Sequence, residues 1–276
     1  MKSKKGILFV IPGLAGVILF YLLPFLDVAV RSFRRINGEF CGFDNYRQVI
    51  ENKAFGLAVG NTVHFVLVCL PLLLGLSLVV AAMLQRGGNG AKFCKSGYLI
   101  PLAVPAAGIV LLWKLVFDSH GMLNHLLSLL GKNTVDFMNT NAAFYVLVFS
   151  YIWKNLGYTV VLWSAGLSAI PESIYEAAAV DGAGKFRTFV RITLPNLKQS
   201  AFTIVVISFL NSFKVFREAY LVAGSYPQES IYMLQHLFNN WFRELSTDKM
   251  AAAAVFLFLV ILVFVCILQR SWEEER

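Results

Sequence analysis

The sequence predicts an all-α integral membrane protein, and three observations carry that prediction. Hydrophobic residues make up 58% of the 276 residues and charged residues only 14%, whereas soluble domains carry roughly a quarter charged residues. The mean hydropathy is +0.66. The apolar residues also gather in runs of the length that a helix needs to cross a bilayer, roughly 20 residues. Charge this sparse cannot cover a water-exposed surface, which argues against an ordinary soluble domain.

Six apolar runs qualify as transmembrane helices. In order, they cover residues 7–30, 61–84, 98–116, 142–170, 201–222 and 250–268. The first three contain Pro, which such helices tolerate because neighbouring helices satisfy the freed backbone groups. The first run has a basic start like a signal peptide, but its apolar stretch of about 24 residues exceeds the usual 7–15 and no A-x-A site follows. We therefore expect it to be retained as a helix.

An even number of spans places both termini on one side of the membrane. With both termini inside, the inner segments carry 12 Lys and Arg in 55 residues, counted over 1–6, 85–97, 171–199 and 270–276. The outer segments, counted over 31–60, 114–143 and 214–249 so that they include the ends of the third and fifth runs, carry 11 in 96. Positive residues are enriched on the cytoplasmic side, so this density favours cytoplasmic termini, although Arg31, Arg34 and Arg35 after the first span oppose it. We find no tandem repeat, low-complexity segment or linker, and expect a single domain over residues 1–276.

Two outer segments have helical patterns, residues 42–62 and residues 230–242, the second with an aromatic face. We expect both to pack on the rim of the membrane domain; alternatively, they receive something from outside. The net charge of +8 comes from scattered Lys and Arg, which membrane topology explains better than nucleic-acid binding does.

Metal and catalytic chemistry have little support. The cysteines form no CxxC and no two share a predicted loop, so neither a disulfide framework nor a zinc site is expected; they are Cys41, Cys69, Cys94 and Cys266. The sequence contains no GxxxxGK[ST] to cradle phosphates and no GxSxG or HExxH. An intramembrane enzyme would need paired catalytic residues at membrane depth, for which only Lys214 and Glu218 are candidates. We therefore expect a protein that is not an enzyme.

A polar stretch separates the fourth and fifth runs. It reads IPESIYEAAAVDGAGKFRTFVRITLPNLKQ over residues 170–199. Pro171 suits the start of a helix, and Asp181-Gly182 is a turn signal. Apolar positions after the turn predict a second helix, which we expect to end at Leu194-Pro195 because Pro disfavours helix in the residue before it. The stretch predicts a helix–turn–helix; alternatively, it is an amphipathic connector on the bilayer.

Spacing within this stretch matches a known pattern. Glu176-Ala177-Ala178 is followed after three residues by Gly182, after nine more by Ile192, and after one more by Leu194-Pro195. The pattern is similar to the EAA loop of the membrane subunits of bacterial binding-protein-dependent ABC importers. The resemblance covers most of the chain: LFVIPGLAGVILFYLLPFLDVAVRSF, GFDNYRQVI and GNTVHF look like the opening of sugar-importer permeases of the maltose, lactose and glycerol-phosphate first-subunit type. It implies a type I importer permease with a six-helix core.

The resemblance also implies partners and roles. The loop, about residues 171–199, would dock on a separate dimeric ATPase that binds ATP and Mg²⁺, so this chain would bind no cofactor. A second homologous permease and an extracytoplasmic sugar-binding protein are implied, in a bacterial plasma membrane with both termini cytoplasmic. The implied coupling residues are Glu176, Ala177, Ala178, Asp181, Gly182, Ala183, Phe186, Phe189, Ile192, Leu194 and Pro195.

Polar and aromatic residues inside the fourth and fifth runs are candidates for the substrate pathway, because such residues in a membrane mark pathways by default. They are Trp153, Asn155, Tyr158, Trp163, Ser208, Asn211, Lys214 and Glu218. They could equally serve as polar contacts between helices or as interfacial anchors. Lys214 and Glu218 could simply pair as i, i+4 neighbours, and Lys154 and Lys214 would suit an anionic saccharide.

The leading hypothesis is a permease that imports a sugar or oligosaccharide. The alternative is the same architecture carrying another small solute, such as a polyol or glycerol phosphoester. A channel or secondary carrier would lack the EAA loop.

Overall fold

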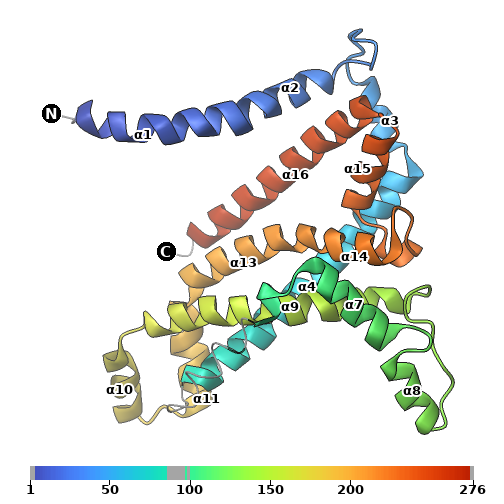
Figure 1. The fold of residues 1–276 in the computed structure, drawn as a ribbon. Coiled ribbons are helices and arrows are strands. Elements are labelled where there is room, and N and C mark those ends of the chain that lie inside the picture. The colour runs from blue at the N-terminus through green and yellow to red at the C-terminus, as the bar shows by residue number, and fades with distance from the viewer. Residues whose placement is uncertain (1–3, 86–96, 98–99, 274–276) are drawn as a thin grey trace. The chain divides into compact units, whose positions relative to one another are not determined.

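The computed structural model describes residues 4–85, 97 and 100–273 (Figure 1). Within these residues the secondary structure is helical, apart from one isolated bridge between Arg34 and Phe40. The described residues group into two compact units, one made of Met1–Gly56 with Leu237–Ile267 and the other of Leu57–His236 with the C-terminal end. Each unit is described separately.

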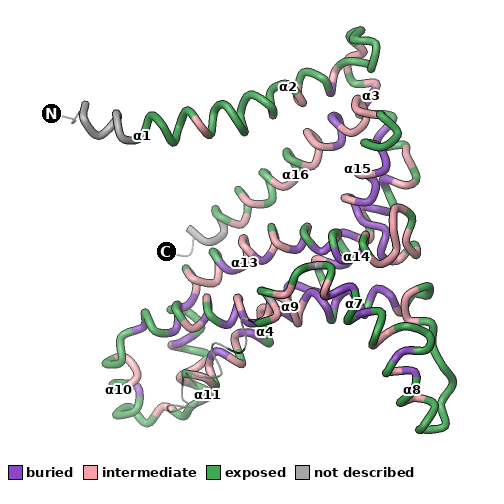
Figure 2. The backbone as a smooth tube through the Cα atoms, viewed as in Figure 1, coloured by how far each residue is buried: buried purple, intermediate pink, exposed green. Residues whose placement is uncertain are grey.

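The first unit contains the first apolar run. Helix α1 (Lys4–Val17), the π-helical turn η1 (Ile18–Leu22) and helix α2 (Leu23–Arg31) follow one another without a break. Pro24 lacks the N–H that an α-helix needs, and the helix widens just before it, where the Leu23 N–H bonds the Ile18 carbonyl five residues back. Most residues of Val10–Arg31 are exposed (Figure 2), as expected for a helix that faces lipid.

The same unit holds α3 (Asp44–Ile50) and most of α16 (Thr247–Glu273). Rings of Phe25 and Phe258 pack with centroids 4.6 Å apart, joining α2 to α16. The buried Asn45 amide donates to the carbonyls of Ser32 and Arg34, which fixes α3 against the loop after the first helix. Helix α15 (Leu234–Arg243) forms as well, with the residues from Leu237 onward in this unit. The helical patterns predicted within residues 42–62 and 230–242 are therefore confirmed.

The second unit is built around α4 (Lys53–Gln85), α9 (Ala142–Ser168) and the interrupted helix α13 (Lys198–Ser212), η3 (Phe213–Val215) and α14 (Phe216–Ala223). Helix α7 (Ala106–Phe117) packs on α14, and α9 packs on α13. The shorter elements are α6 (Ile100–Ala103), α8 (Met122–Leu129) and η4 (Glu229–Ile231). A core cluster of this unit includes Phe65, Leu73, Ile109 and Leu147.

Five helices in the described residues are long and apolar enough to cross a membrane, and they correspond to the predicted first, second, fourth, fifth and sixth spans. The predicted third span, residues 98–116, is instead divided into α6 and α7, and residues 98–99 lie outside the described part. The break falls at Val104-Pro105, where Pro105 has extended backbone angles (φ −60°, ψ 149°). Pro105 also has no N–H to donate to a preceding helical turn, which is consistent with the helix breaking there.

The connector between α9 and α13 is a helix–turn–helix, as predicted. Helix α10 (Glu172–Val180) is followed by α11 (Lys185–Thr188), the π-helical turn η2 (Phe189–Thr193) and α12 (Leu194–Asn196). The predicted end at Leu194-Pro195 is wrong, because the helix continues through Pro195. The Leu194 N–H bonds the Phe189 carbonyl five residues back, so the widened turn accommodates the proline as the turn before Pro24 does.

Candidate functional site

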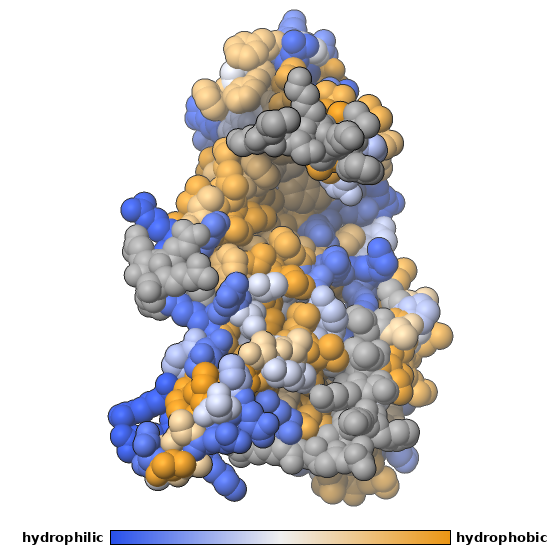
Figure 3. Space-filling view, turned by 90° about the vertical axis from the view of Figure 1, so that its left-hand side faces the viewer, coloured by the Kyte–Doolittle hydropathy of each residue, from blue (hydrophilic) through white to orange (hydrophobic). Residues whose placement is uncertain are grey.

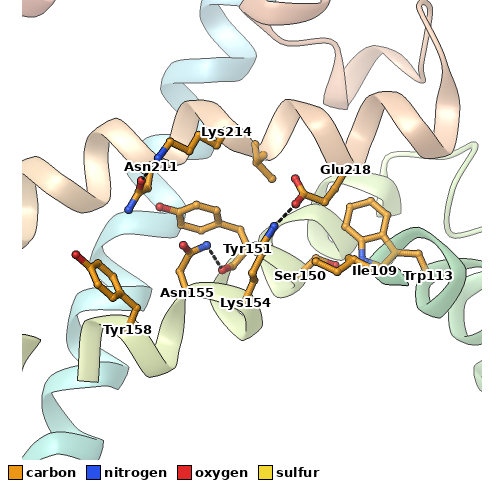
Figure 4. A pocket seen from close by; sticks show the side chains of 11 residues that line it. Ile109, Trp113, Ser150, Tyr151, Lys154, Asn155, Tyr158, Asn211, Lys214 and Glu218 are labelled. Atoms are coloured by element: carbon orange, nitrogen blue, oxygen red, sulfur yellow. Dashed lines mark hydrogen bonds and ion pairs between the residues drawn. The ribbon is translucent and has the colours of Figure 1, made fainter. Parts of the chain in front are cut away.

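A polar cavity of about 320 Å³ lies between α7, α9 and the interrupted α13–η3–α14 helix (Figure 4). It is lined by Ile109, Trp113, Ser150, Tyr151, Lys154, Asn155, Tyr158, Asn211, Lys214, Val215 and Glu218.

Helical spacing places these residues together. Ser150, Lys154 and Tyr158 recur every four residues on α9, with Tyr151 and Asn155 beside them. Residues 211, 214, 215 and 218 follow the i, i+3, i+4, i+7 pattern on the facing helix. Each helix therefore presents a stripe with polar side chains to the cavity, although both are surrounded by apolar sequence.

A buried ion pair crosses the cavity. The Lys154 ammonium donates to Glu218 Oε1, joining α9 to α14 (Figure 4). The Glu218 side chain is only 6% exposed and that of Lys154 is 25% exposed. An ionised carboxylate this deeply buried requires a partner, since desolvation of an unpaired charge is unfavourable by several kcal/mol. Lys154 supplies that partner.

Lys214 does not pair with Glu218, contrary to the possibility that their spacing raised. Its ammonium donates instead to Asn211 Oδ1 at 2.8 Å. Lys214 lies inside the 3₁₀ turn η3, where side chains advance by about 120° per residue rather than 100°. The tighter turn thus rotates Lys214 away from the ideal i, i+4 alignment, and Glu218 bonds across to α9.

Two hydrogen bonds position the remaining polar groups. Tyr151 donates its hydroxyl to the Ser208 carbonyl at 2.8 Å, between α9 and α13. Asn155 Nδ2 donates to the Tyr151 carbonyl at 2.8 Å, one turn back on its own helix. The Asn155 side-chain oxygen is thus left as an acceptor, and Figure 4 shows Asn155 and Tyr158 at the same end of the cavity.

The structure brings together five of the eight residues predicted for the pathway, namely Asn155, Tyr158, Asn211, Lys214 and Glu218. The other three lie elsewhere. Trp153 borders a neighbouring apolar cavity of about 160 Å³, Trp163 is buried in a second core cluster, and Ser208 is buried with its carbonyl accepting from Tyr151.

Sequence reasoning singled out Lys154 only as a possible partner of an anionic saccharide, and it missed five other lining residues: Ile109, Trp113, Ser150, Tyr151 and Val215. The four-residue recurrence of Ser150, Lys154 and Tyr158 was a usable signal for the α9 residues. No local signal identifies Ile109 and Trp113, which reach the cavity from a distant segment.

The α10–α12 hairpin has a well-defined turn. Gly182 has φ +69°, a left-handed conformation that favours glycine. The Gly182 N–H bonds the Ala179 carbonyl and the Ala183 N–H bonds the Ala178 carbonyl, which is a Schellman motif that ends α10. Across the hairpin, the hydroxyls of Tyr175 and Thr193 lie 3.2 Å apart. These contacts hold the two helices as one unit.

The residues of the EAA pattern divide between the surface and the interior of the hairpin. The exposed ones are Glu176, Ala177, Asp181, Gly182, Phe186, Leu194 and Pro195, while Ala178 is buried and Ala183, Phe189 and Ile192 are half-buried. Ala183 and Phe189 line a hollow of about 700 Å³ at the base of the hairpin. Two large apolar side chains stand out at the surface, Val180 at 88% and Phe186 at 82% exposed. Sequence reasoning did not single out Val180.

The hairpin lies in the part of the molecule where hydrophilic residues gather around a few hydrophobic ones, at the bottom of Figure 3. Above it, α9 and α13 come close where Gly166 faces Ser200. A Cβ on Gly166 would lie 2.7 Å from Ser200 Oγ and 2.8 Å from Ser200 Cβ. Glycine is therefore required for this approach of the two helices that flank the hairpin.

In the described residues, no group of three or more His, Cys, Asp and Glu is placed to hold a metal ion. Cys41, Cys69 and Cys266 are free thiols, and Cys94 lies outside the described part.

The chain matches a known protein family and is similar in sequence to known proteins over nearly its full length. The family described as binding-protein-dependent transport system inner membrane component matches residues 62–273. The chain is 30% identical over 282 residues to the trehalose/maltose transport system permease protein MalF of Thermococcus litoralis, covering 100% of this chain and 96% of that protein. It is 28% identical over 278 residues to the sn-glycerol-3-phosphate transport system permease protein UgpA of Yersinia pseudotuberculosis, covering 97% and 94% of the two chains.

Two solved structures share the fold. A chain from a bacterial ABC transporter involved in the import of the acidic polysaccharide alginate superposes with a TM-score of 0.83 at 21% identity, over 96% of this chain and 94% of that one. A second structure, of the bacterial alginate ABC transporter in complex with alginate pentasaccharide-bound periplasmic protein, gives a TM-score of 0.80 at 21% identity, over 94% and 91% of the two chains.

Proposed function

This chain belongs to the family of binding-protein-dependent transport system inner membrane components, and from that premise we propose that it is the permease subunit of an ABC importer for a sugar or oligosaccharide. Relatives that align over nearly the full length are named as permeases for trehalose and maltose and for sn-glycerol 3-phosphate. In this proposal the chain forms half of the pathway and a second, homologous permease forms the other half. It performs no chemistry on the solute.

One observation carries the proposal: the hairpin joins two helices that border the polar cavity. Helix α9 contributes five lining residues and enters the hairpin directly, and the hairpin leads into α13, which carries Asn211. A displacement of the hairpin is therefore passed to both walls. The tight approach of Gly166 and Ser200 holds the two helices together near the hairpin, so that they respond as a unit.

The surface of the hairpin suits docking on a separate ATPase dimer. Glu176 is exposed on α10 and can accept a charge-assisted hydrogen bond from a partner Arg or backbone N–H. Val180 and Phe186 offer apolar side chains for a partner groove. ATP and Mg²⁺ would bind to that partner, and its closure would move the hairpin as a lever. The coupling role extends to the whole EAA pattern, from Glu176 to Pro195.

The remaining parts of the proposal concern the membrane and the outer face. We place the chain in a bacterial plasma membrane with both termini in the cytoplasm, so that the hairpin faces the ATPase. An extracytoplasmic binding protein delivers the solute from the other side. A second candidate is the import of a polyol or glycerol phosphoester, which the likeness to the sn-glycerol-3-phosphate permease and the cation in the cavity favour.

Co-purification from native membrane, followed by reconstitution into liposomes, tests this function. We expect a second permease and an ATPase to accompany the chain, and one saccharide-loaded binding protein to stimulate ATP hydrolysis. Glu176→Ala should lower the stimulated hydrolysis about 10-fold or more, as expected for the loss of a charge-assisted hydrogen bond. Glu39→Ala, which removes the same side chain from the predicted outer loop, should leave it unchanged. If the chain isolates alone and still passes solute, it is a channel or carrier instead.

A further inference from the structure

The charges that line the cavity do not cancel. Two lysines and one glutamate line it, and the lining carries no other acidic or basic residue. Glu218 is committed to Lys154 through the buried ion pair, so that pair is neutral as a unit. Within the described residues, the partner of Lys214 is an amide oxygen, Asn211 Oδ1. The lining on this chain therefore has a net charge of +1, which is located at Lys214.

The neighbourhood of Lys214 contains donors in excess. A lysine ammonium can only donate, so the Asn211 side-chain atom that it contacts must be the oxygen. The Asn211 NH₂ group therefore does not contact Lys214, and this NH₂ group has no acceptor among the described residues. The ammonium of Lys214, an exposed residue, also has two N–H groups with no acceptor in the part of the chain that the structure describes. A group that satisfies this end of the cavity must accept several hydrogen bonds at once, as a carboxylate or phosphate does.

The backbone marks the same position. The membrane-length helix that carries Asn211 and Glu218 is interrupted by a 3₁₀ turn, and Lys214 is the middle residue of that turn. A 3₁₀ turn in the middle of a helix often marks a functional position, and interrupted helices at membrane depth are tolerated where they line a cavity. Charge, free donors and helix interruption coincide at one residue.

The cavity also offers uncharged chemistry. Figure 4 shows Asn155 and Tyr158 on the same side of the cavity as Asn211 and Lys214, and Trp113 at the opposite end. Within the described part of the chain, the Asn155 side-chain oxygen and the Tyr158 hydroxyl have no hydrogen-bond partner, and Trp113 supplies an aromatic surface. Hydroxyl groups and the C–H faces of a sugar or polyol match these side chains. Building on the function proposed above, we propose that the cavity selects a polyhydroxy solute with a single negative charge, and that Lys214 recognises that charge.

Two kinds of solute share this chemistry: a saccharide with one uronate carboxylate and a glycerophosphodiester. The test uses the complete importer, with its own binding protein, reconstituted in liposomes. ATP-driven uptake is measured for an aldobiouronic acid, its methyl ester, glycerophosphoglycerol and neutral saccharides of two to five units. The methyl ester removes the charge and preserves the rest of the saccharide. Uptake of the acid identifies the uronate class and uptake of glycerophosphoglycerol the phosphodiester class.

We expect one of the anions to be taken up, and Lys214→Met to lower the efficiency of its uptake about 10- to 100-fold, as for the loss of a hydrogen bond to a charged group. Lys214→Arg should retain most of the uptake, and Lys114→Met, which removes a lysine of α7 that does not line the cavity, should retain all of it. Equal assembly with the partner subunits shows that each variant folds.

Preferred uptake of a neutral saccharide or of the methyl ester overturns the inference, as does unchanged anion uptake by Lys214→Met. Import of a neutral saccharide would still support the proposed function. Absence of uptake across the whole panel, with no stimulation of ATP hydrolysis, overturns the proposed function itself, and the inference with it.

Discussion

Breaking the Lys154–Glu218 ion pair should destabilise the protein unequally, depending on which partner is removed. Lys154→Met leaves the carboxylate of Glu218, which is only 6% exposed, without a counter-charge. Loss of one partner of a buried pair lowers the free energy of unfolding by about 3–5 kcal/mol. Glu218→Met leaves an ammonium on a side chain that is 25% exposed and whose flexible stem can reach water. We expect that variant to lose about 1.5–3 kcal/mol, the range for a lost hydrogen bond to a charged group.

The double variant, Lys154→Met with Glu218→Met, provides the sharper test. It removes both charges and replaces them with apolar side chains of similar volume, which is often neutral or stabilising. We therefore expect the double variant to be more stable than Lys154→Met alone, even though it carries one more substitution. Such non-additivity is the signature of two residues in direct contact.

Thermal unfolding of the purified protein at a fixed scan rate measures these differences, since unfolding of such proteins is commonly irreversible. With a shift of about 2–4 °C per kcal/mol for chains of 150–250 residues, Lys154→Met should unfold at a temperature lower by about 10 °C. The exposed-surface control Lys114→Met should shift it little. Equal effects of the two single substitutions, or a double variant destabilised by their sum, would refute the argument from burial.

Two other sites give independent predictions. Gly166→Ala should destabilise the protein by about 1–3 kcal/mol, as overpacking does, because its Cβ would lie within 2.8 Å of two Ser200 atoms. The control Gly75→Ala, where the added Cβ meets open space, should leave the unfolding temperature unchanged. Equal unfolding temperatures for the two variants would contradict the contact. Burial lowers the pKa of His236 to about 4, from 6.5. As pH falls, the unfolded chain therefore binds a proton at this histidine before the folded chain does. The contribution of neutral His236 to the free energy of unfolding is fully present above about pH 6.5 and declines by about 3 kcal/mol toward pH 4. His236→Phe should reduce the change in unfolding temperature between pH 7.5 and pH 5, whereas replacement of the exposed His120 should leave that change as it is. An unchanged pH dependence in His236→Phe would assign it to other groups.

The secondary structure could largely be predicted because its determinants are local in the sequence. Apolar runs of about 20 residues predict spanning helices wherever they occur, and Asp181-Gly182 predicts the turn of the hairpin through the left-handed conformation of Gly182. The errors came at prolines. Pro105 divides the third span, whereas Pro195 is accommodated by a π-helical turn. Leu194, directly before Pro195, is helical (φ −60°, ψ −45°), so the rule that a residue before proline avoids helix does not by itself decide where a helix ends.

The sequence by itself determined the membrane class, the number of apolar runs, and the pattern in residues 176–195 that indicated the family. The tertiary structure decided which polar residues share a cavity. Lys214 and Glu218 are four residues apart in the sequence, yet Glu218 pairs with Lys154 from another helix. Trp163 is buried in a core cluster and does not line the cavity. The physical reason is that periodicity determines which face of a helix a residue occupies, whereas the identity of the helix opposite that face depends on packing over long sequence separations.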